Sequence, residues 1–259
     1  MIFLTHKELI GVLEREFPLY LAESWDNTGL QVGPFDDEIR RIGVALNPSL
    51  RTLYLAVEKG CNFLLTHHPL ILTGLRRVDL SGSIGKVINL AILKKITIYS
   101  IHTPWDSALG GGNDYWADLL GLENRNPIVP LRENPQTGIG RVGEVYGTSF
   151  YDMVSFLKKE VRFLIPVFSG KDKIYKVALC TGSGGDLLEK VISLRVDVYI
   201  TCDLKYHQIL NALYAGLNLI ILSHHEMEEK SLFYLERRLR DLLPSLGLEI
   251  LKEEDPFLG

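Results

Sequence analysis

Short apolar runs alternate with amphipathic stretches along most of the chain, a pattern typical of α/β units. In the first half, apolar runs predict buried strands at residues 42–46, 62–66 and 97–101. Amphipathic spacing predicts helices at residues 5–16, 50–59 and 83–94. The first of these helices begins with Thr5 as its N-cap and has Glu8 in the capping-box position.

The second half repeats this order of elements. Strands are predicted at 176–180, 197–201 and 218–222, a turn at 181–185, and helices at 186–194 and 207–214. Val44 lies 133 residues before Val177, and Asn62 lies 135 residues before Asp197. This period is too long for a solenoid. It favours two similar α/β domains related by duplication, against the alternative of chance similarity between two common strand–helix–strand units.

The remaining segments indicate how the domains are joined. A stretch rich in proline, asparagine and glycine, residues 123–138, predicts the link between the halves. A strand is expected at 141–146 and a helix at 149–159. After Glu228 a charged amphipathic helix continues to about Leu242 and is expected to pack on the first half, with an edge strand at 248–251. The predicted first domain comprises residues 1–124 and 225–259, and the second comprises residues 125–224.

Composition narrows the class of protein. The chain has 259 residues, of which 46% are hydrophobic and 23% charged, as expected for a globular protein. A net charge of −4 argues against general nucleic-acid binding. Three scattered cysteines do not suit a disulfide framework or a four-cysteine zinc site. The first eight residues lack a signal-peptide pattern, and apolar stretches are too short to span a membrane. We expect a reduced, cytoplasmic protein without membrane attachment.

The histidines are the candidate functional residues. Five of the seven directly follow predicted strands: His67, His68, His102, His224 and His225. The carboxyl ends of strands in an open α/β sheet line the ligand crevice, so these side chains can converge. Asp106 and Glu228 each come four positions after a histidine, on the turn that follows it.

Imidazole nitrogen and carboxylate oxygen together suit zinc, iron, manganese, nickel or cobalt. Adjacent histidines on a turn point in different directions, so His67 and His68 could serve two metals bridged by a carboxylate, and two metals can activate a water. Taken alone, His67-His68-Pro69 is more typical of a hydrogen-bonded loop, and His102 with Asp106 of a pair that orders a loop.

The other two histidines are weaker candidates for functional residues. His6 is interpreted as an exposed residue at a helix start. For His207, a structural or substrate-facing role is as open as metal ligation.

Three polar turns could contact a substrate. Residues 181–186 could cradle a phosphate with backbone amides, although they lack a P-loop lysine and suit a plain tight turn equally well. Residues 110–114 are interpreted as a flexible turn before a helix at 115–120. Residues 25–29 could line the cleft or stabilise a turn.

Six segments, in order and across nearly the whole chain, give the sequence a specific resemblance to a known family. They are residues 23–33, 66–69, 102–106, 138–143, 201–207 and 224–228. The sequence resembles the dinuclear-metal-centre family known as GTP cyclohydrolase I type II, or the Nif-three-like (NGG-interacting factor) family. It departs from the usual family pattern at Cys202 and Ser223, where glycine is common, and at Pro104-Trp105, where asparagine-leucine is common.

The resemblance implies an α/β fold of two similar interlocked domains, each a mixed sheet flanked by helices. It also implies a toroidal homohexamer, a trimer of dimers, with two divalent metal ions per chain facing an internal cavity. The implied metal ligands are His67, His68, Asp106, His224 and Glu228, with Glu228 or Asp106 as the bridge. His102 is interpreted as a residue beside the ligands or a proton shuttle, and Cys202 could add a thiol near the site. The short link leaves no room for the domain that some members insert.

The leading functional hypothesis is a metal-dependent hydrolase acting on a nucleotide-like substrate, with ring opening of GTP as the implied reaction. An activated water would attack C8 of the purine, and His102 or His207 would move protons. The products would be formate and dihydroneopterin triphosphate. This substrate rests on the family name, because the sequence shows no guanine-reading motif. The alternatives are a dimetal phosphoesterase, which would release inorganic phosphate, and a ring-shaped metal-containing binding or regulatory protein without catalysis.

Overall fold

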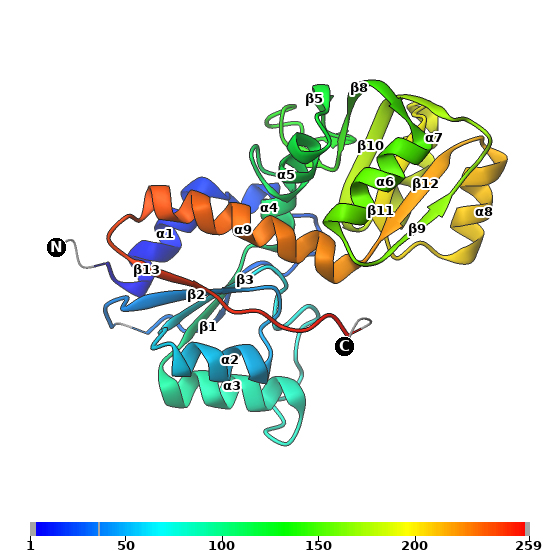
Figure 1. The fold of residues 1–259 in the computed structure, drawn as a ribbon. Helices are drawn as coiled ribbons and strands as arrows, with labels where there is room; N and C mark the ends of the chain where they lie inside the picture. Colours follow the sequence, from blue (N-terminus) through cyan, green and yellow to red (C-terminus); the bar gives the residue numbers. More distant parts are fainter. Residues whose placement is uncertain (1–3, 36, 257–259) are drawn as a thin grey trace. The chain divides into compact units, whose positions relative to one another are not determined.

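The computed structural model describes residues 4–35 and 37–256 and divides the chain into two compact units (Figure 1). Unit 1 comprises Met1–Trp105 and Leu232–Gly259, and unit 2 comprises Asp106–Ser231. The chain passes from one unit to the other within helix α4 (His102–Ser107) and within helix α9 (His224–Leu242). The predicted division, at residues 124 and 224, differs because helix α5 (Gly112–Leu119) packs on strands of unit 2.

Unit 1 is built on a five-stranded mixed sheet with the order β1-β4-β3-β2-β13. Its strands are β1 (Gly29–Val32), β2 (Arg41–Ala45), β3 (Phe63–Thr66), β4 (Thr97–Ser100) and β13 (Gly247–Ile250). Only β1 runs antiparallel to its neighbour, and β13 pairs with β2 as the predicted edge strand. Strands β3 and β4 are buried along their whole length, as expected for strands covered on both faces.

Helices cover both faces of this sheet (Figure 1). Helices α2 (Leu50–Glu58) and α3 (Ser83–Lys94) lie on one face, and α1 (His6–Glu16) with the later part of α9 lies on the other. A short 3₁₀ turn, η1 (Leu19–Leu21), follows α1. The predicted capping box of α1 is present, with the Thr5 and Glu8 side chains each accepting from the other's backbone.

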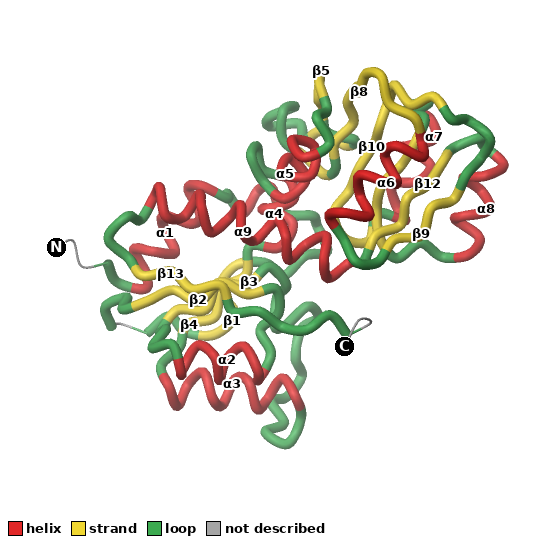
Figure 2. The backbone as a smooth tube through the Cα atoms, viewed as in Figure 1, coloured by secondary structure: helices red, strands yellow, loops and turns green. Residues whose placement is uncertain are grey.

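Unit 2 contains a six-stranded mixed sheet with the order β5-β8-β10-β11-β12-β9 (Figure 2). Its strands are β5 (Glu123–Asn126), β8 (Arg141–Ser149), β9 (Leu164–Val167), β10 (Lys173–Ser183), β11 (Val198–Cys202) and β12 (Asn218–Leu222). The central strands β10, β11 and β12 are parallel, whereas the outer strands pair antiparallel. A separate ribbon pairs β6 (Val129–Pro130) with β7 (Gly138–Ile139).

Two hydrophobic clusters lie against this sheet. One contains Trp116 of α5 and Phe150 of α6 (Phe150–Glu160). The other contains Val191 of α7 (Leu188–Ser193), which follows the 3₁₀ turn η2 (Gly185–Leu187), and Ala212 of α8 (Tyr206–Tyr214). The predicted α/β architecture with two mixed sheets flanked by helices is therefore confirmed. In the described part of the chain, no helix has the length and apolarity needed to cross a membrane.

Several local predictions were wrong. The expected link at 123–138 contains strands β5 and β6, and β5 pairs with β8 inside unit 2. Residues 102–106 and 224–228, expected as turns, lie in helices α4 and α9. Strand β10 continues to Ser183, through most of the turn expected at 181–185. Strands β1 and β9 were not predicted.

The interpretation of His6 as an exposed residue was also wrong. The side chain is fully buried, with Nδ1 2.6 Å from Thr97 Oγ1 and Nε2 3.1 Å from Asn62 Nδ2. His6, Leu9 and Leu13 follow one another at helical spacing and form the buried face of α1. The helical periodicity therefore indicated that His6 is buried, although histidine is a polar residue type.

The hydrogen bonds of Arg141 explain why the segment 138–143 has a glycine at position 140. The side chain is buried, and its five N–H groups donate to Asp114 and to the carbonyls of Ala108, Gly138 and Gly140. Gly140 has φ +66°, and an added Cβ would lie 2.9 Å from the Leu179 carbonyl oxygen. A glycine there lets the backbone turn its carbonyl toward the guanidinium.

We predict that Asp114→Ala lowers the free energy of unfolding by about 3–5 kcal/mol, because it strips a buried guanidinium of its counter-charge. The matched control is Asp118→Ala, whose carboxylate pairs with the partly exposed Arg125 at 2.6 Å. That surface pair should contribute less than about 1 kcal/mol. Urea unfolding of the two variants measures the difference, and equal losses would contradict the role assigned to Arg141.

Candidate metal centre

Three histidines of unit 1 converge at the carboxyl ends of two neighbouring parallel strands. His67 and His68 follow β3, and His102 follows β4 after one residue. One candidate ligand atom from each of the three side chains lies within 4.8 Å of the others. The ring centroids are 4.9–5.4 Å apart. The sequence-based expectation that these histidines meet is thus confirmed.

The backbone of the histidine pair is held from both sides. The His67 and His68 amides donate to the carbonyls of Ala45 and Leu46, at 3.1 and 3.0 Å. From the β4 side, the Ser100 hydroxyl donates to the His67 carbonyl at 2.7 Å. These bonds fix the turn from which both imidazoles project.

Asp26 orients His102. The buried carboxylate accepts from His102 Nδ1 at 2.8 Å and from the amide and hydroxyl of Thr103. Burial by itself would raise the pKa of Asp26, but the hydrogen bonds from His102 and Thr103 outweigh it and hold the pKa below its ordinary value of 3.8. A carboxylate can only accept, so Nδ1 of His102 carries a proton, and in the neutral ring the lone pair lies on Nε2.

The Asp26 contact also assigns a role to the polar turn 25–29, which the sequence left open between lining a cleft and stabilising a turn. Beside Asp26, the Trp25 ring packs edge-on against His102, with centroids 5.6 Å apart. The turn therefore supports a candidate site residue directly.

The three candidate ligands of unit 2 surround the end of strand β10. Asp106 Oδ1 accepts from the Thr181 hydroxyl at 2.9 Å. At the next residue, a Cβ added to Gly182 would lie 2.6 Å from Glu228 Oε1 and 3.6 Å from His224 Nε2. Because Thr181 and Gly182 are adjacent, the carboxylates of Asp106 and Glu228 and the imidazole of His224 gather around one strand end.

Two backbone amides of the segment 181–186 are occupied within the protein. The Thr181 amide donates to Asn113 Oδ1 at 2.9 Å, and the Gly184 amide donates to Thr201 Oγ1 at 3.0 Å. Tyr199 donates its hydroxyl to the Gly184 carbonyl. The glycines instead allow close approach of side chains to the strand end.

His224 lies between two carboxylates. Its Nε2 is 2.9 Å from Glu228 Oε1, one helical turn along α9, and its Nδ1 contacts Asp203. Burial by itself would lower the pKa of His224, but Glu228 and Asp203 together raise it from 6.5 to about 10. In the metal-free protein this imidazole is therefore protonated at neutral pH.

Two residues that depart from the family pattern have structural explanations. Cys202 is fully buried, its thiol lies 3.4 Å from the Met227 sulfur, and burial raises its pKa well above the ordinary value. In the metal-free protein it is a neutral thiol directed at Met227. Ser223 precedes α9, and its hydroxyl accepts from the Glu226 amide as an N-cap.

Neither cluster includes His207 or His225. His207 is exposed on α8, so its proposed part in proton transfer remains a prediction. His225 is nearly buried, with Nε2 3.8 Å from Glu229.

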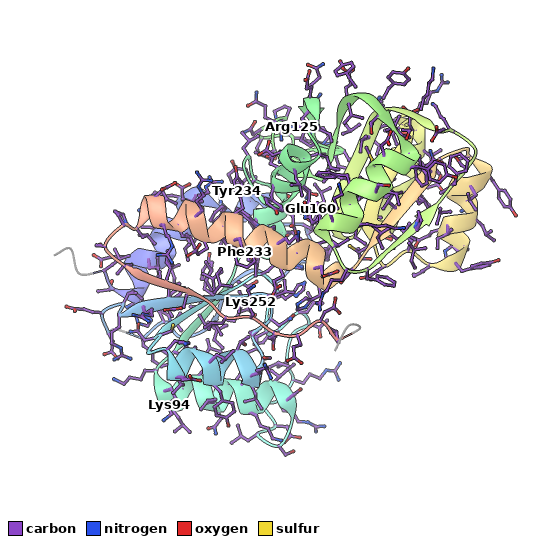
Figure 3. The ribbon with its side chains drawn as sticks, in the orientation of Figure 1. Lys94, Arg125, Glu160, Phe233, Tyr234 and Lys252 are labelled. Atoms are coloured by element: carbon purple, nitrogen blue, oxygen red, sulfur yellow. The ribbon has the colours of Figure 1, made fainter. Side chains whose placement is uncertain are left out.

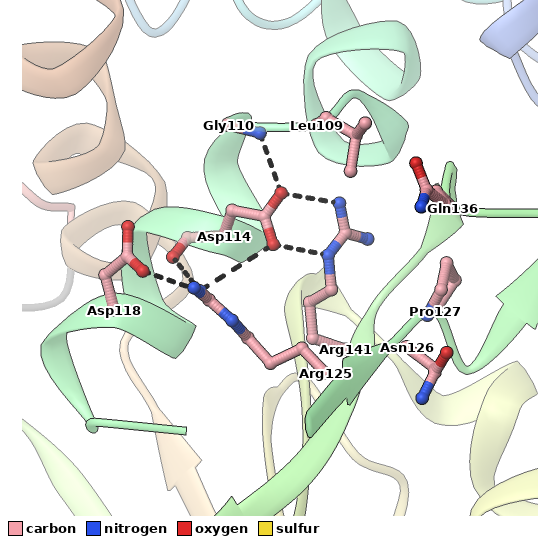
Figure 4. Close-up of a pocket in the computed structure, with 9 residues that line it drawn as sticks. All are labelled: Leu109, Gly110, Asp114, Asp118, Arg125, Asn126, Pro127, Gln136 and Arg141. Carbon is pink, nitrogen blue, oxygen red and sulfur yellow. Dashed lines mark hydrogen bonds and ion pairs between the residues drawn. The ribbon is translucent and has the colours of Figure 1, made fainter. Parts of the chain in front are cut away.

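A cavity of about 430 Å³ in unit 2 lies apart from these ligands (Figure 4). Arg141, Arg125, Asp114 and Asp118 line it, and their charges are paired with one another. None of the candidate metal ligands lines this cavity.

The donor sets fit a divalent transition metal. Imidazole nitrogens bind zinc at about 2.0–2.1 Å, so two nitrogens on one ion lie at most about 4.2 Å apart. A cluster spanning up to 4.8 Å therefore closes on an ion with small side-chain movements. Mixed nitrogen and oxygen donors suit zinc, iron or manganese.

We predict that Gly182→Ala lowers metal affinity at least tenfold, because its Cβ would displace the Glu228 carboxylate. Gly216→Ala is the control: Gly216 has φ +72° against +69° for Gly182, but nothing lies within 4 Å of its added Cβ. Both variants should lose about 1–2 kcal/mol of stability from backbone strain. Competition with a metal-chelating dye measures affinity, and equal affinities would contradict the placement of Glu228 in the site.

Comparison with known proteins agrees with this architecture. The "GTP cyclohydrolase 1 type 2 homolog" of Methanocaldococcus jannaschii is 34% identical over 249 residues, covering 95% of this chain and 97% of the relative. The Drosophila melanogaster "NIF3-like protein 1" is 27% identical, covering 96% and 92%.

Solved structures show the same fold. The Bacillus cereus protein related to NIF3 has a TM-score of 0.92 at 21% identity, covering 100% of both chains. Reduced HcgD from Methanocaldococcus jannaschii has a TM-score of 0.86 at 33% identity, covering 98% of this chain and 100% of that one. The family model Duf34/NIF3 (NGG1p interacting factor 3) matches residues 4–256, and the chain therefore belongs to the NIF3 family.

Proposed function

We propose that this chain is a metal-dependent hydrolase that holds two divalent ions with His67, His68, Asp106, His224 and Glu228. The observation that carries the proposal is two sets of donors that suit the same class of metal: three histidines at strand ends in unit 1, and Asp106, His224 and Glu228 beside the end of β10 in unit 2. A purely structural zinc site is commonly tetrahedral and rich in cysteine, whereas mixed histidine and carboxylate donors are typical of sites that leave room for water or substrate.

Bound metals would supply Lewis acidity and lower the pKa of a water toward neutrality. The chain's own residues would orient and move protons. His102 presents Nε2 beside the histidine pair while Asp26 keeps the proton on Nδ1. This arrangement makes His102 either a further ligand or the group that accepts a proton from the attacking water. His207 on α8 is retained as a second candidate for proton transfer to the leaving group.

The proposed reaction is hydrolytic opening of the purine ring of GTP at C8, with release of formate. Support for this substrate comes from the relatives, several of which are named GTP cyclohydrolase 1 type 2 homologs. Residues 181–186, which the sequence left open between a phosphate cradle and a plain tight turn, have the Thr181 and Gly184 amides occupied within the protein.

The proposal also includes a homohexamer in the cytoplasm. Family membership supports the assembly, and three buried free cysteines suit a reducing compartment.

Protein purified without chelator or affinity tag should contain about two divalent ions per chain by plasma mass spectrometry, since five of the six residues in the two clusters are the proposed ligands. His67→Ala should lose at least one ion together with activity. His207→Ala should retain both ions, because this exposed side chain belongs to neither cluster.

Product analysis of the metal-loaded wild type then separates the two activities. Release of formate from GTP would support ring opening, whereas release of inorganic phosphate would indicate phosphoester hydrolysis instead. A loaded protein that turns over no nucleotide would contradict the hydrolase and favour a binding protein.

Metal binding should release a proton from His224. Its pKa of about 10 in the metal-free protein lies above the unfolded value of 6.5, so the proton's stabilising effect is complete below pH 6.5 and is lost as pH rises through 10. Near pH 8, calorimetry in two buffers of different ionisation enthalpy should report about one proton released per chain. The His224→Gln variant should release none from this site, and equal release by both proteins would rule out His224 as a ligand.

A further inference from the structure

His68 belongs to a hydrogen-bonded chain that ends on the C-terminal segment of unit 1. Its Nδ1 lies 2.8 Å from Asn47 Oδ1, and Asn47 Nδ2 lies 3.0 Å from Glu253 Oε2. We propose that Glu253 and Asn47 are positioning residues that fix the tautomer of His68 and so prepare it as a metal ligand. The inference rests on the proposed function only in taking His68 as a ligand.

The direction of each bond follows from the chemistry of its partners. A carboxylate only accepts, so the Asn47 atom facing Glu253 must be the amide nitrogen. The Asn47 oxygen then faces His68 and can only accept, so His68 must donate from Nδ1. The lone pair of His68 is thereby placed on Nε2. Without the carboxylate, Asn47 could rotate its amide and present a donor to His68, which would reverse the tautomer.

Glu253 is itself held in place. Its other oxygen accepts from the hydroxyl of Ser49, the N-cap of α2. Two residues earlier, Leu251 is buried and its amide donates to the Val44 carbonyl at 2.8 Å. Lys252 places its ammonium 4.6 Å from the centroid of the Phe233 ring on α9 (Figure 3). The segment after β13 is therefore anchored on both sides of Glu253.

The arrangement parallels the one behind His102 but contains one more residue. Asp26 contacts His102 directly, whereas Glu253 reaches His68 through an amide. In both cases a carboxylate keeps the proton on Nδ1 of a histidine in the cluster. Partners that orient ligating histidines in this way typically change metal affinity 10–100-fold when removed.

The test reads the tautomer of His68 in the metal-free protein by long-range proton–nitrogen NMR correlations at about pH 8, above the ordinary histidine pKa. His68→Gln identifies the signals. Wild type should show one tautomer, with the proton on Nδ1. Glu253→Gln should give a mixture of tautomers, because a glutamine amide can either donate to or accept from Asn47.

The control is Glu254→Gln, which removes the neighbouring exposed carboxylate, 3.9 Å from Arg51, and should leave the tautomer unchanged. The double variant Asn47→Asp with Glu253→Gln moves the carboxylate one position along the chain of bonds. It should restore the Nδ1 proton, since a carboxylate beside His68 accepts without ambiguity. A merely structural role of Glu253 would predict neither the mixture nor the rescue.

Metal affinity provides the second readout. Asn47→Ala should weaken zinc binding about 10–100-fold, and Glu253→Gln should weaken it less, with recovery in the double variant. If Glu253→Gln keeps both the wild-type tautomer and the wild-type affinity, the positioning role is overturned. If wild type binds no zinc while the tautomer pattern follows the variants, the proposed metal function fails and the control of His68 by Glu253 stands.

Discussion

Polar side chains at the buried ends of strands are costly unless each has a hydrogen-bonding partner, and the organisation of this protein follows from that constraint. His67, Asp106 and Glu228 are almost fully buried. The Thr181 hydroxyl donates to Asp106, and His224 Nε2 lies 2.9 Å from Glu228 Oε1. The backbone carbonyl of His67 accepts from the Ser100 hydroxyl on the neighbouring strand. Within each unit, the sheet therefore positions the candidate ligands and also orients them.

Carboxylates beside the candidate histidines extend the same principle. Asp26 and Glu253 come from distant parts of the sequence, yet each determines which nitrogen of a histidine carries the proton. Asp203 and Glu228 have a different effect on His224, because together they keep it protonated until a metal competes for the ring. At the proposed site, metal binding would thus be coupled to the protonation state of His224 in unit 2 and to the docking of the C-terminal segment in unit 1.

The sequence predicted the main elements because their patterns are local. The capping box of Thr5, the helix at 83–94 and the strand at 218–222 were all identified within the chain's own spacing. Histidines after parallel strands also follow a general rule, so their convergence in unit 1 could be anticipated. Partners more than seventy residues apart could not: Asp26 with His102 and Glu253 with Asn47 become visible only in the fold. The prediction of a link at 123–138 was wrong because proline and glycine occur here in short strands as well as in loops.

The central claim is that ligands from the two clusters hold two metal ions. Anomalous diffraction from crystals grown with zinc or manganese tests it most directly. The account predicts two peaks per chain, at about 2.0–2.2 Å from ligand atoms of His67, His68, Asp106, His224 and Glu228. Peaks bound elsewhere, or no peak beside these residues in metal-saturated crystals, would contradict it.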